Sequence, residues 1–573
     1  MMKKIYFIIV TTTALLVCGC QKILDTKNLY QKDLGNFFKT PTDITEAMGG
    51  VYNALYVGGV FSEEHLSANL MSDEMLGGGG PDDITAKNCD KFLDPTEDTY
   101  RDLWKQTYNG VYRSSAIIEA VTDANYASYF NTAQEASDFK NTVLGEAYFM
   151  RGFFMYRAAR FFGGMPLIPK TNSPRNVPRA SFTETFGQIA SDFIMAGNTM
   201  LAIDPVAVPL SGYGHTNRWV AKAYLARTYL FYTGYMTNIE KQATTELPLP
   251  DGSSLTKAEV ITQLNDVITN SKYQLTPDFR NLWPYSYVNT SAGSVVLPWA
   301  NTLGLKWVGQ DGPNSTIGTG NKEVMFSLSF AFGNWGWNEG QKFNNRIPLF
   351  FGIRGNSLIP FGEGWGWGPI HTQFFNDWPA TDLRRDASVL QMGQADQGTG
   401  GYQPNKGDQE TDMYNKKYTH LQHNGKDGVK GMFYYIYNWN NGDPMQLESA
   451  QDFYYLRYSD VLLMHSELTE TADGINAVRA RVGLAAVTYS IDNLKKERQY
   501  EFAFEGLRWF DLVRWGDVEN PAKNYYSVPC NVMNSGVAGV YTNTYPIAIK
   551  GLVPIPESEV RLSNGVYIQN PGW

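Results

Sequence analysis

Three glutamates near the C-terminal end follow one another at four-residue intervals, the spacing that places side chains on one face of a helix. They are Glu497, Glu501 and Glu505. Two carboxylates one helical turn apart resemble the pair of a retaining glycosidase, whose carboxyl groups lie about 5 Å apart. The same segment also carries apolar and basic side chains: Phe502, Phe504, Trp509, Phe510, Arg498, Arg508 and Arg514. We therefore predict a buried ion-pair network that fixes helix packing, and no catalytic residues.

Residues with the spacing of other catalytic or metal sites are sparse. His420 and His423 are three residues apart, but no acid or third histidine stands at ligand spacing. Neither a G-x-S-x-G nucleophile elbow nor a phosphate-binding G-x-x-x-x-G-K occurs. Asp82, Asp83 and Asp90 offer oxygen ligands for calcium without the spacing of an EF-hand. We expect no metal site, no cofactor and no enzyme activity.

Aromatic side chains in glycine- and asparagine-rich segments are better candidates for function. Phe, Trp and Tyr make up 14% of the chain, and flat apolar ring faces suit the faces of pyranose rings. The candidate ligand-binding residues lie on three predicted loops: Trp283 and Tyr285, then Trp299 and Trp307, then Trp335 and Trp337. The alternative for each residue is that it packs against its own loop. We predict that at least two of the set contact a ligand.

The segments that must position these side chains have a helical pattern. Thr40, Pro41 and Asp43 fit the start of a helix with a capping box, and apolar residues then recur at helical intervals. Further helices are predicted over 100–121, 143–162, 182–201, 219–235 and 258–270. They suggest helix pairs of the tetratricopeptide kind, although no strict 34-residue period is visible.

The pattern changes from about residue 273 to residue 442, where glycine, asparagine and tryptophan crowd together and helical periodicity fades. Helices are predicted to return over 453–468, 474–482 and 492–515. Long loops within a compact protein often serve binding. We therefore predict a mostly α fold: a tetratricopeptide-like helical repeat body with a loop-rich, irregular ligand-binding side.

The N-terminus has the features of an export signal. Lys3 and Lys4 precede an apolar stretch that is too short to span a bilayer. It ends in Gly19-Cys20, which resembles a bacterial lipobox, so Cys20 is the predicted lipidation site. An ordinary secretory signal with incidental cysteines is the alternative. We expect a signal peptide at 1–19, a lipidated tether at 20–39, a helical-repeat region at 40–272 and a region with binding loops and closing helices at 273–573.

Charge and cysteine content narrow the choice of partners. The net charge is −9, and it becomes −11 when the two lysines of the signal are removed. An acidic chain of this kind argues against a nucleic-acid partner, because phosphate binding needs a basic surface. Beyond the signal and Cys20, the chain has Cys89 and Cys530, which pair or remain as buried thiols.

Several segments together resemble the SusD/RagB family of surface nutrient-binding lipoproteins. The resemblance runs from about Thr40 to Trp573, with the segments in the family's order. They are 150–157, 162–167, 217–227, 382–385, 456–464, 497–515 and 554–556. One departure is Ser114-Ser115, where family members often carry an asparagine.

The resemblance implies a protein that binds oligosaccharide nutrients and delivers them to a partner TonB-dependent, SusC-like transporter. Such a protein is lipid-anchored in the outer membrane and faces the exterior. The segment Ser72-Asp73-Glu74 resembles one that helps to line the family's ligand site, so Asp73 is expected to accept hydrogen bonds from sugar hydroxyls. Three alternatives remain: a peptide-binding lid of the RagB kind, a surface glycoside hydrolase, and a scaffold that binds only proteins.

Overall fold

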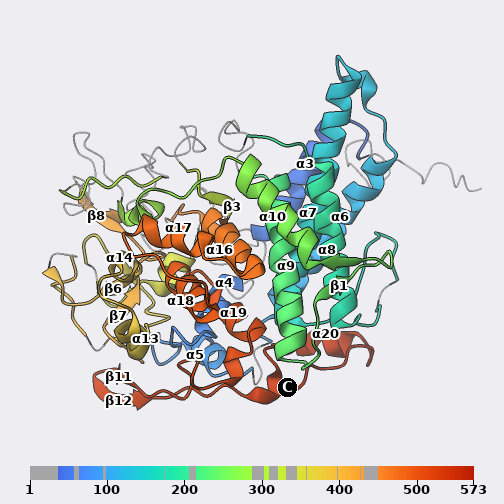
Figure 1. Ribbon diagram of the computed structural model, residues 1–573. Helices are drawn as coiled ribbons and strands as arrows, with labels where there is room; N and C mark the ends of the chain where they lie inside the picture. The colour runs from blue at the N-terminus through green and yellow to red at the C-terminus, as the bar shows by residue number, and fades with distance from the viewer. Residues whose placement is uncertain are drawn as a thin grey trace, which may run out of the picture.

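The structure is a computed structural model (Figure 1). It describes residues 37–56, 64–94, 98–174, 176–204, 214–286, 302–308, 321–330, 345–356, 358–395, 398–404, 406–425, 428–431 and 449–573.

An array of long helices makes up one side of the molecule (Figure 1). Each packs against its neighbours, with α7 central to α3, α6 and α8. The array comprises α3 (Pro41–Asn53), α6 (Arg101–Thr122), α7 (Ala133–Phe162), α8 (Phe182–Thr199), α9 (Arg218–Asn238) and α10 (Lys257–Asn270). This confirms the mostly α, tetratricopeptide-like prediction.

Capping boxes set the start of several of these helices. The predicted box at Thr40 and Asp43 is present, and equivalent boxes begin α7 at Thr132, α8 at Ser181 and α10 at Thr256. The box at Thr132 places the start of α7 at Ala133, whereas the apolar pattern predicted a start at residue 143. The first turns of α7 are exposed and polar, so periodicity alone does not mark them.

The helical array continues into the C-terminal part of the chain. Helix α10 packs on α16 (Tyr458–Thr469), and α16 packs on α17 (Asp473–Arg481) and α18 (Ile491–Glu501). Helix α19 (Arg508–Arg514) packs on α9 and on α4 (Glu64–Leu70). Segments that are distant in the sequence are thus built into one body.

The other side of the molecule has short helices and two-stranded sheets (Figure 1). The antiparallel pairs on this side are β3 (Val324–Leu328) with β10 (Phe453–Arg457), β6 (Val389–Gln391) with β7 (Met413–Asn415), β8 (Gln422–Gly425) with β9 (Gly428–Gly431), and β11 (Cys530–Asn534) with β12 (Val537–Tyr541). The antiparallel pair β1 (Glu246–Pro248) with β2 (Ser254–Thr256) lies instead against α8, α9 and α10. Strands β4 (Ile353–Arg354) and β5 (Glu363–Gly364) pair in parallel. The short helices on this side are α5 (Ile84–Asp90), α12 (Ile347–Phe351), α13 (Thr372–Asp377) and α14 (Leu383–Ser388), whereas α20 (Glu557–Leu562) lies below the long helices in Figure 1.

Two helices predicted from the sequence are divided in the structure. Residues 453–457 form strand β10, because a Phe-Tyr-Tyr-Leu-Arg run favours a pleated conformation and pairs with β3. The predicted helix 492–515 is split into α18 and α19. Between them, Phe504 and Gly506 adopt positive φ angles of 64° and 73°. A Cβ on Gly506 would lie 2.7 Å from the His65 ring, so there is no room for a side chain between this backbone position and α4.

Side chains from α4 and the segment after it fasten the two ends of the chain together. Asn69 Nδ2 donates a hydrogen bond to the Phe504 carbonyl, and Gly506 N donates to Asn69 Oδ1. Arg508 pairs with Asp73, 435 residues earlier. Among the described helices, none is both long enough and apolar enough to cross a membrane.

Candidate ligand-binding surfaces

The three glutamates at four-residue spacing lie in a buried ion-pair network, as predicted. Their exposed fractions are 1% for Glu497, 0% for Glu501 and 6% for Glu505. Arg457 Nη1 donates to Glu501 Oε1 at 2.7 Å, and its Nε donates to Glu505 Oε2 at 2.9 Å. Arg384 Nη1 donates to Glu497 Oε1 at 2.6 Å. These arginines come from β10 and α14, so the network ties separate elements together.

The wider network has five acidic and five basic side chains. Its acids are Asp382, Glu323, Glu497, Glu501 and Glu505, and its bases are Arg384, Lys417, Arg457, Arg479 and Arg481. The basic partners differ from those that the sequence suggested. Arg498, Arg508 and Arg514 instead pair with Asp460, Asp511, Asp73 and Glu467.

Electrostatics argue against a proton-donating role for Glu501, the central glutamate of the three. Burial raises the pKa of the Glu501 carboxyl, but Arg481, Arg457 and Arg384 outweigh it and hold that pKa well below its usual range. A glycosidase needs one carboxyl that keeps its proton near neutral pH. Glu501 is therefore unsuited to the role of general acid.

Asp73 is placed inside the protein. Its side chain is fully buried, and both of its oxygens accept hydrogen bonds of 2.8 Å from Arg508. The Tyr525 backbone N–H donates to the same carboxylate at 3.1 Å. The geometry gives Asp73 a role in joining α4 to α19. Contact between Asp73 and sugar hydroxyls stays a prediction that requires the pair with Arg508 to open.

The structure brings together three of the aromatic candidates in its interior. Trp283 lies 5.5 Å from the Tyr454 ring between ring centroids, and Trp307 lies beside the Tyr454 hydroxyl. The Tyr285 hydroxyl donates to the Ala387 carbonyl at 2.7 Å. The exposed fractions are 0% for Trp283, 1% for Tyr285 and 4% for Trp307, so none presents a ring face to solvent. Their ligand contact stays a prediction that requires the covering residues to move aside.

Other candidates lie outside the described residues: Cys20, Trp299, Trp335 and Trp337. Cys89 and Cys530 are free buried thiols. Within the described ranges, no three His, Cys, Asp or Glu side chains are grouped as metal ligands. Asp83 and Asp90, considered above for calcium, accept hydrogen bonds from Gly80 and Tyr541 respectively.

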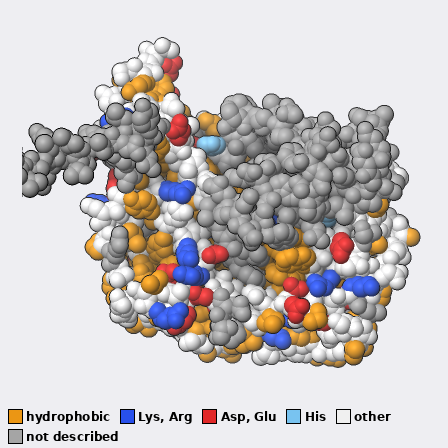
Figure 2. Space-filling model, turned by 180° about the vertical axis from the view of Figure 1, so that it is seen from behind, with side chains coloured by type: hydrophobic (Ala, Val, Ile, Leu, Met, Phe, Trp, Pro, Cys, Tyr) orange, Lys and Arg blue, Asp and Glu red, His pale blue; other side chains and the backbone are white. Residues whose placement is uncertain are grey.

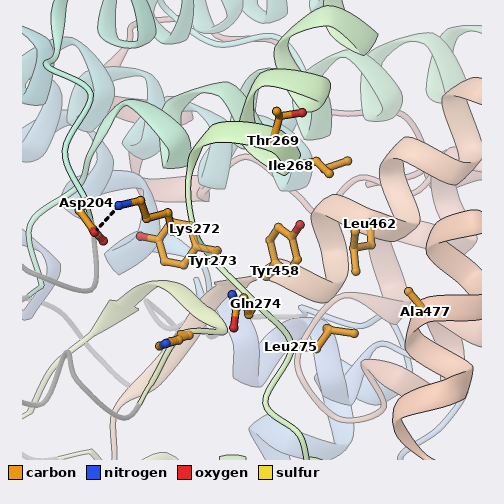
Figure 3. Close-up of a pocket in the computed structure, with 11 residues that line it drawn as sticks. Asp204, Ile268, Thr269, Lys272, Tyr273, Gln274, Leu275, Tyr458, Leu462 and Ala477 are labelled. Carbon is orange, nitrogen blue, oxygen red and sulfur yellow. Dashed lines mark hydrogen bonds and ion pairs between the residues drawn. The ribbon is translucent and has the colours of Figure 1, made fainter.

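A pocket that the sequence did not suggest lies beside α10, α16 and α17 (Figure 3). Its volume is about 750 Å³. Aliphatic, aromatic, amide and charged side chains line it: Asp204, Ile268, Thr269, Lys272, Tyr273, Gln274, Leu275, Lys322, Tyr458, Leu462 and Ala477. They come from residues 268–275 and from separate positions at 204, 322, 458–462 and 477 that share no motif, so sequence periodicity could not have grouped them.

Charged side chains on the back face are interspersed by sign on the part that is described (Figure 2). Basic and acidic groups alternate there among apolar and neutral side chains. On this described part of the back face, the mixture is consistent with the acidic net charge of the chain.

Taken together, the fold defines a helical-repeat protein whose irregular side is held to the helices by a buried ion-pair network. The family described as "SusD family" matches residues 367–573, and the family described as "Starch-binding associating with outer membrane" matches residues 22–230. The chain belongs to the SusD/RagB family.

Relatives and solved structures of this family match over most of the chain. SusD-like protein P2 of Formosa agariphila is 23% identical, with 89% of this chain and 90% of that protein covered. A SusD-like protein of Bacteroides ovatus is 22% identical, with coverages of 89% and 82%. The structure of surface glycan-binding protein A from Bacteroides fluxus has a TM-score of 0.67 and 21% identity, with 93% of this chain and all of that chain covered. Surface glycan-binding protein A from Bacteroides thetaiotaomicron, in complex with laminarihexaose, has a TM-score of 0.67 and 19% identity, with coverages of 93% and 99%.

Proposed function

We propose that this protein binds oligosaccharide nutrients at the cell surface and delivers them to a partner TonB-dependent, SusC-like transporter. The observation that carries the proposal is the match of 93% of the chain to surface glycan-binding proteins, one of them in complex with laminarihexaose. The family description that matches the N-terminal part also names starch binding and association with the outer membrane. Capture must be reversible, because the ligand has to pass on to the transporter.

The proposed mechanism is binding without chemistry. Aromatic rings would supply apolar contact with the sugar rings, and polar side chains would read the orientation of the hydroxyl groups. Trp299, Trp335 and Trp337 are candidates for stacking on the sugar rings. Trp307 could do so only after the residues that bury it move aside. The ion-pairing of Glu497, Glu501 and Glu505 supports binding over the glycoside hydrolase alternative.

A titration with oligosaccharides tests this proposal. Protein without residues 1–20 is titrated by calorimetry against laminarin oligosaccharides, other plant, host-mucin and microbial glycans, and mixed peptides. We expect saturable binding of one glycan class, with no products detected by chromatography after prolonged incubation. Binding of peptides alone would move the protein to the peptide-binding alternative, and appearance of shortened glycans would favour the hydrolase.

We also propose that Cys20 carries the lipid and that residues 20–39 tether the body to the outer membrane. A tether raises the local concentration of the protein at a membrane-embedded partner. Substitution Cys20→Ala is expected to shift most of the protein from the membrane fraction to the soluble fraction. The matched control is Cys18→Ala, which should stay with the membrane. Membrane retention of Cys20→Ala, or loss only with Cys18→Ala, would contradict the assignment.

A further inference from the structure

The pocket beside α10, α16 and α17 has walls that are held in place by the backbone (Figure 3). The Gln274 N–H donates to the Lys322 carbonyl at 2.9 Å, and the Tyr458 N–H donates to the Glu323 carbonyl at 2.8 Å. The segment after α10 and the start of α16 are therefore both fixed to residues 322–323. A pocket of about 750 Å³ with fixed walls is of the size that holds a small ligand.

The lining combines apolar surface with uncommitted polar groups. Ile268, Leu275 and Leu462 are half-buried around Tyr458, which is 8% exposed. In the part of the chain that the structure describes, the Tyr458 hydroxyl and the side-chain amide of Gln274 make no hydrogen bond within the protein, so they are available to a ligand. The Tyr273 hydroxyl, by contrast, is bound by Asn217 Nδ2 at 3.0 Å and serves the packing.

The charge of the lining is positive although the whole chain is acidic. Lys272 Nζ pairs with Asp204 Oδ2 at 2.9 Å, so these two charges compensate each other (Figure 3). Lys322 is exposed and pairs with no carboxylate among the described residues. The adjacent Glu323 is fully buried and directed to Arg457 and Arg481, so it is not the partner of Lys322. One positive charge is left for a ligand.

We propose that this pocket binds a sugar unit that carries a negatively charged group, either a carboxylate or a sulfate ester. Lys322 would bind the anionic group, while Gln274 and the Tyr458 hydroxyl would bind ring hydroxyls against the apolar lining. The choice of a sugar rests on the proposed function. The anionic requirement rests on the unpaired lysine and the compensated Lys272–Asp204 pair.

The test uses the full chain purified in detergent and titrated by calorimetry with three matched oligosaccharides. One carries uronic acids, its carboxyl-reduced counterpart is neutral, and the third carries sulfate esters. We expect the acidic ligands to bind at least tenfold more tightly than the neutral one, with affinity that falls as salt rises. Lys322→Gln should weaken the acidic ligands about tenfold, and Tyr458→Phe, which removes a single hydroxyl, about threefold. The control Lys105→Gln, an exposed lysine on α6, should bind like the wild type.

Hydrogen exchange locates the site independently of affinity. The acidic ligand should slow exchange in peptides that cover residues 268–275 and 458–462. The pocket proposal would be overturned, with the proposed function intact, by two results together. The wild type and Lys322→Gln would bind glycans with equal affinity, and the ligand would not protect these peptides from exchange. Failure to bind any glycan would instead contradict the proposed function. Equal binding of free acetate, sulfate or an acidic peptide would overturn the assignment to a sugar.

Discussion

Substitution Arg457→Met is expected to lower the free energy of unfolding by about 3–5 kcal/mol. The Arg457 guanidinium contacts the carboxylates of Glu323, Glu501 and Glu505 at 2.6–2.9 Å and is almost completely buried. Methionine fills a similar volume but leaves these carboxylates with fewer partners. The loss is large because removing one partner leaves buried charges that are poorly compensated. Such charges destabilise the fold by more than the intact pair stabilises it.

Urea unfolding followed by tryptophan fluorescence measures this change. Arg385→Met is the matched control, because Arg385 lies on the same short helix as Arg384 but pairs with the half-exposed Asp386. Loss of such a pair is expected to cost about 1 kcal/mol or less. Adding Glu505→Gln to Arg457→Met should recover part of the loss, because it restores equal numbers of acidic and basic groups in the network, while Lys417 keeps its hydrogen bond to the Glu501 carbonyl. A loss no larger than that of Arg385→Met would contradict the account of the network.

The sequence could predict the helical array because each helix carries its own local signals. The capping box at Thr40 and Asp43 and the apolar periodicity that follows it depend on neighbours within one or two turns. The resemblance to the SusD/RagB family then supplied the order of the segments. The start of a helix whose first turns are exposed and polar, such as α7, could not be located from apolar periodicity.

The breaks in the C-terminal helices depend on contacts that are distant in the sequence. Nothing near Gly506 in the sequence shows that His65 of α4 approaches its Cα. Likewise, Phe453–Arg457 has helical spacing of apolar residues, yet it pairs with strand β3 more than a hundred residues earlier. At both positions, contacts with distant parts of the chain determine the backbone conformation against the local helical pattern.

The candidate site was the least predictable feature for a related physical reason. Aromatic side chains suit both a ligand surface and a protein core, and Trp283 and Tyr285 proved to be core residues. Asp73 has the chemistry of a sugar ligand, but its partner Arg508 lies 435 residues away. The pocket near Tyr458 could not be predicted because its lining comes from five separated segments. Composition identifies the type of chemistry, whereas burial decides which residues perform it.

Glu74 is expected to make the protein less stable as the pH rises from about 4.5 to about 8. The side chain is 1% exposed, and its carboxylate lies 3.9 Å from Arg508 Nε, which donates a hydrogen bond to Asp73, as does Arg508 Nη2. The net effect of the surroundings raises the pKa of Glu74 from 4.5 to about 8. Burial is the largest cause; the positive charge of Arg508 lowers the pKa in part, and the negative charge of Asp73 raises it further. Between these two pH values, the folded state keeps a proton that the unfolded state releases, so the free energy of unfolding falls as pH rises.

Substitution Glu74→Gln removes the titrating carboxyl group, so the free energy of unfolding should depend less on pH. At pH 8.5 the variant is expected to be more stable than the wild type by several kcal/mol, with roughly 5 as the upper limit, and near pH 5 the two should differ by less than about 1. Urea unfolding across pH 5–8.5 measures both differences.

Burial also raises the pKa of Asp90, to about 7, but that group is present in both proteins, so the difference between them isolates Glu74. Glu246→Gln, at an exposed position on β1, should follow the wild type throughout. Parallel curves for wild type and Glu74→Gln would show that Glu74 is ionised in the folded protein, and that Arg508 then serves both carboxylates.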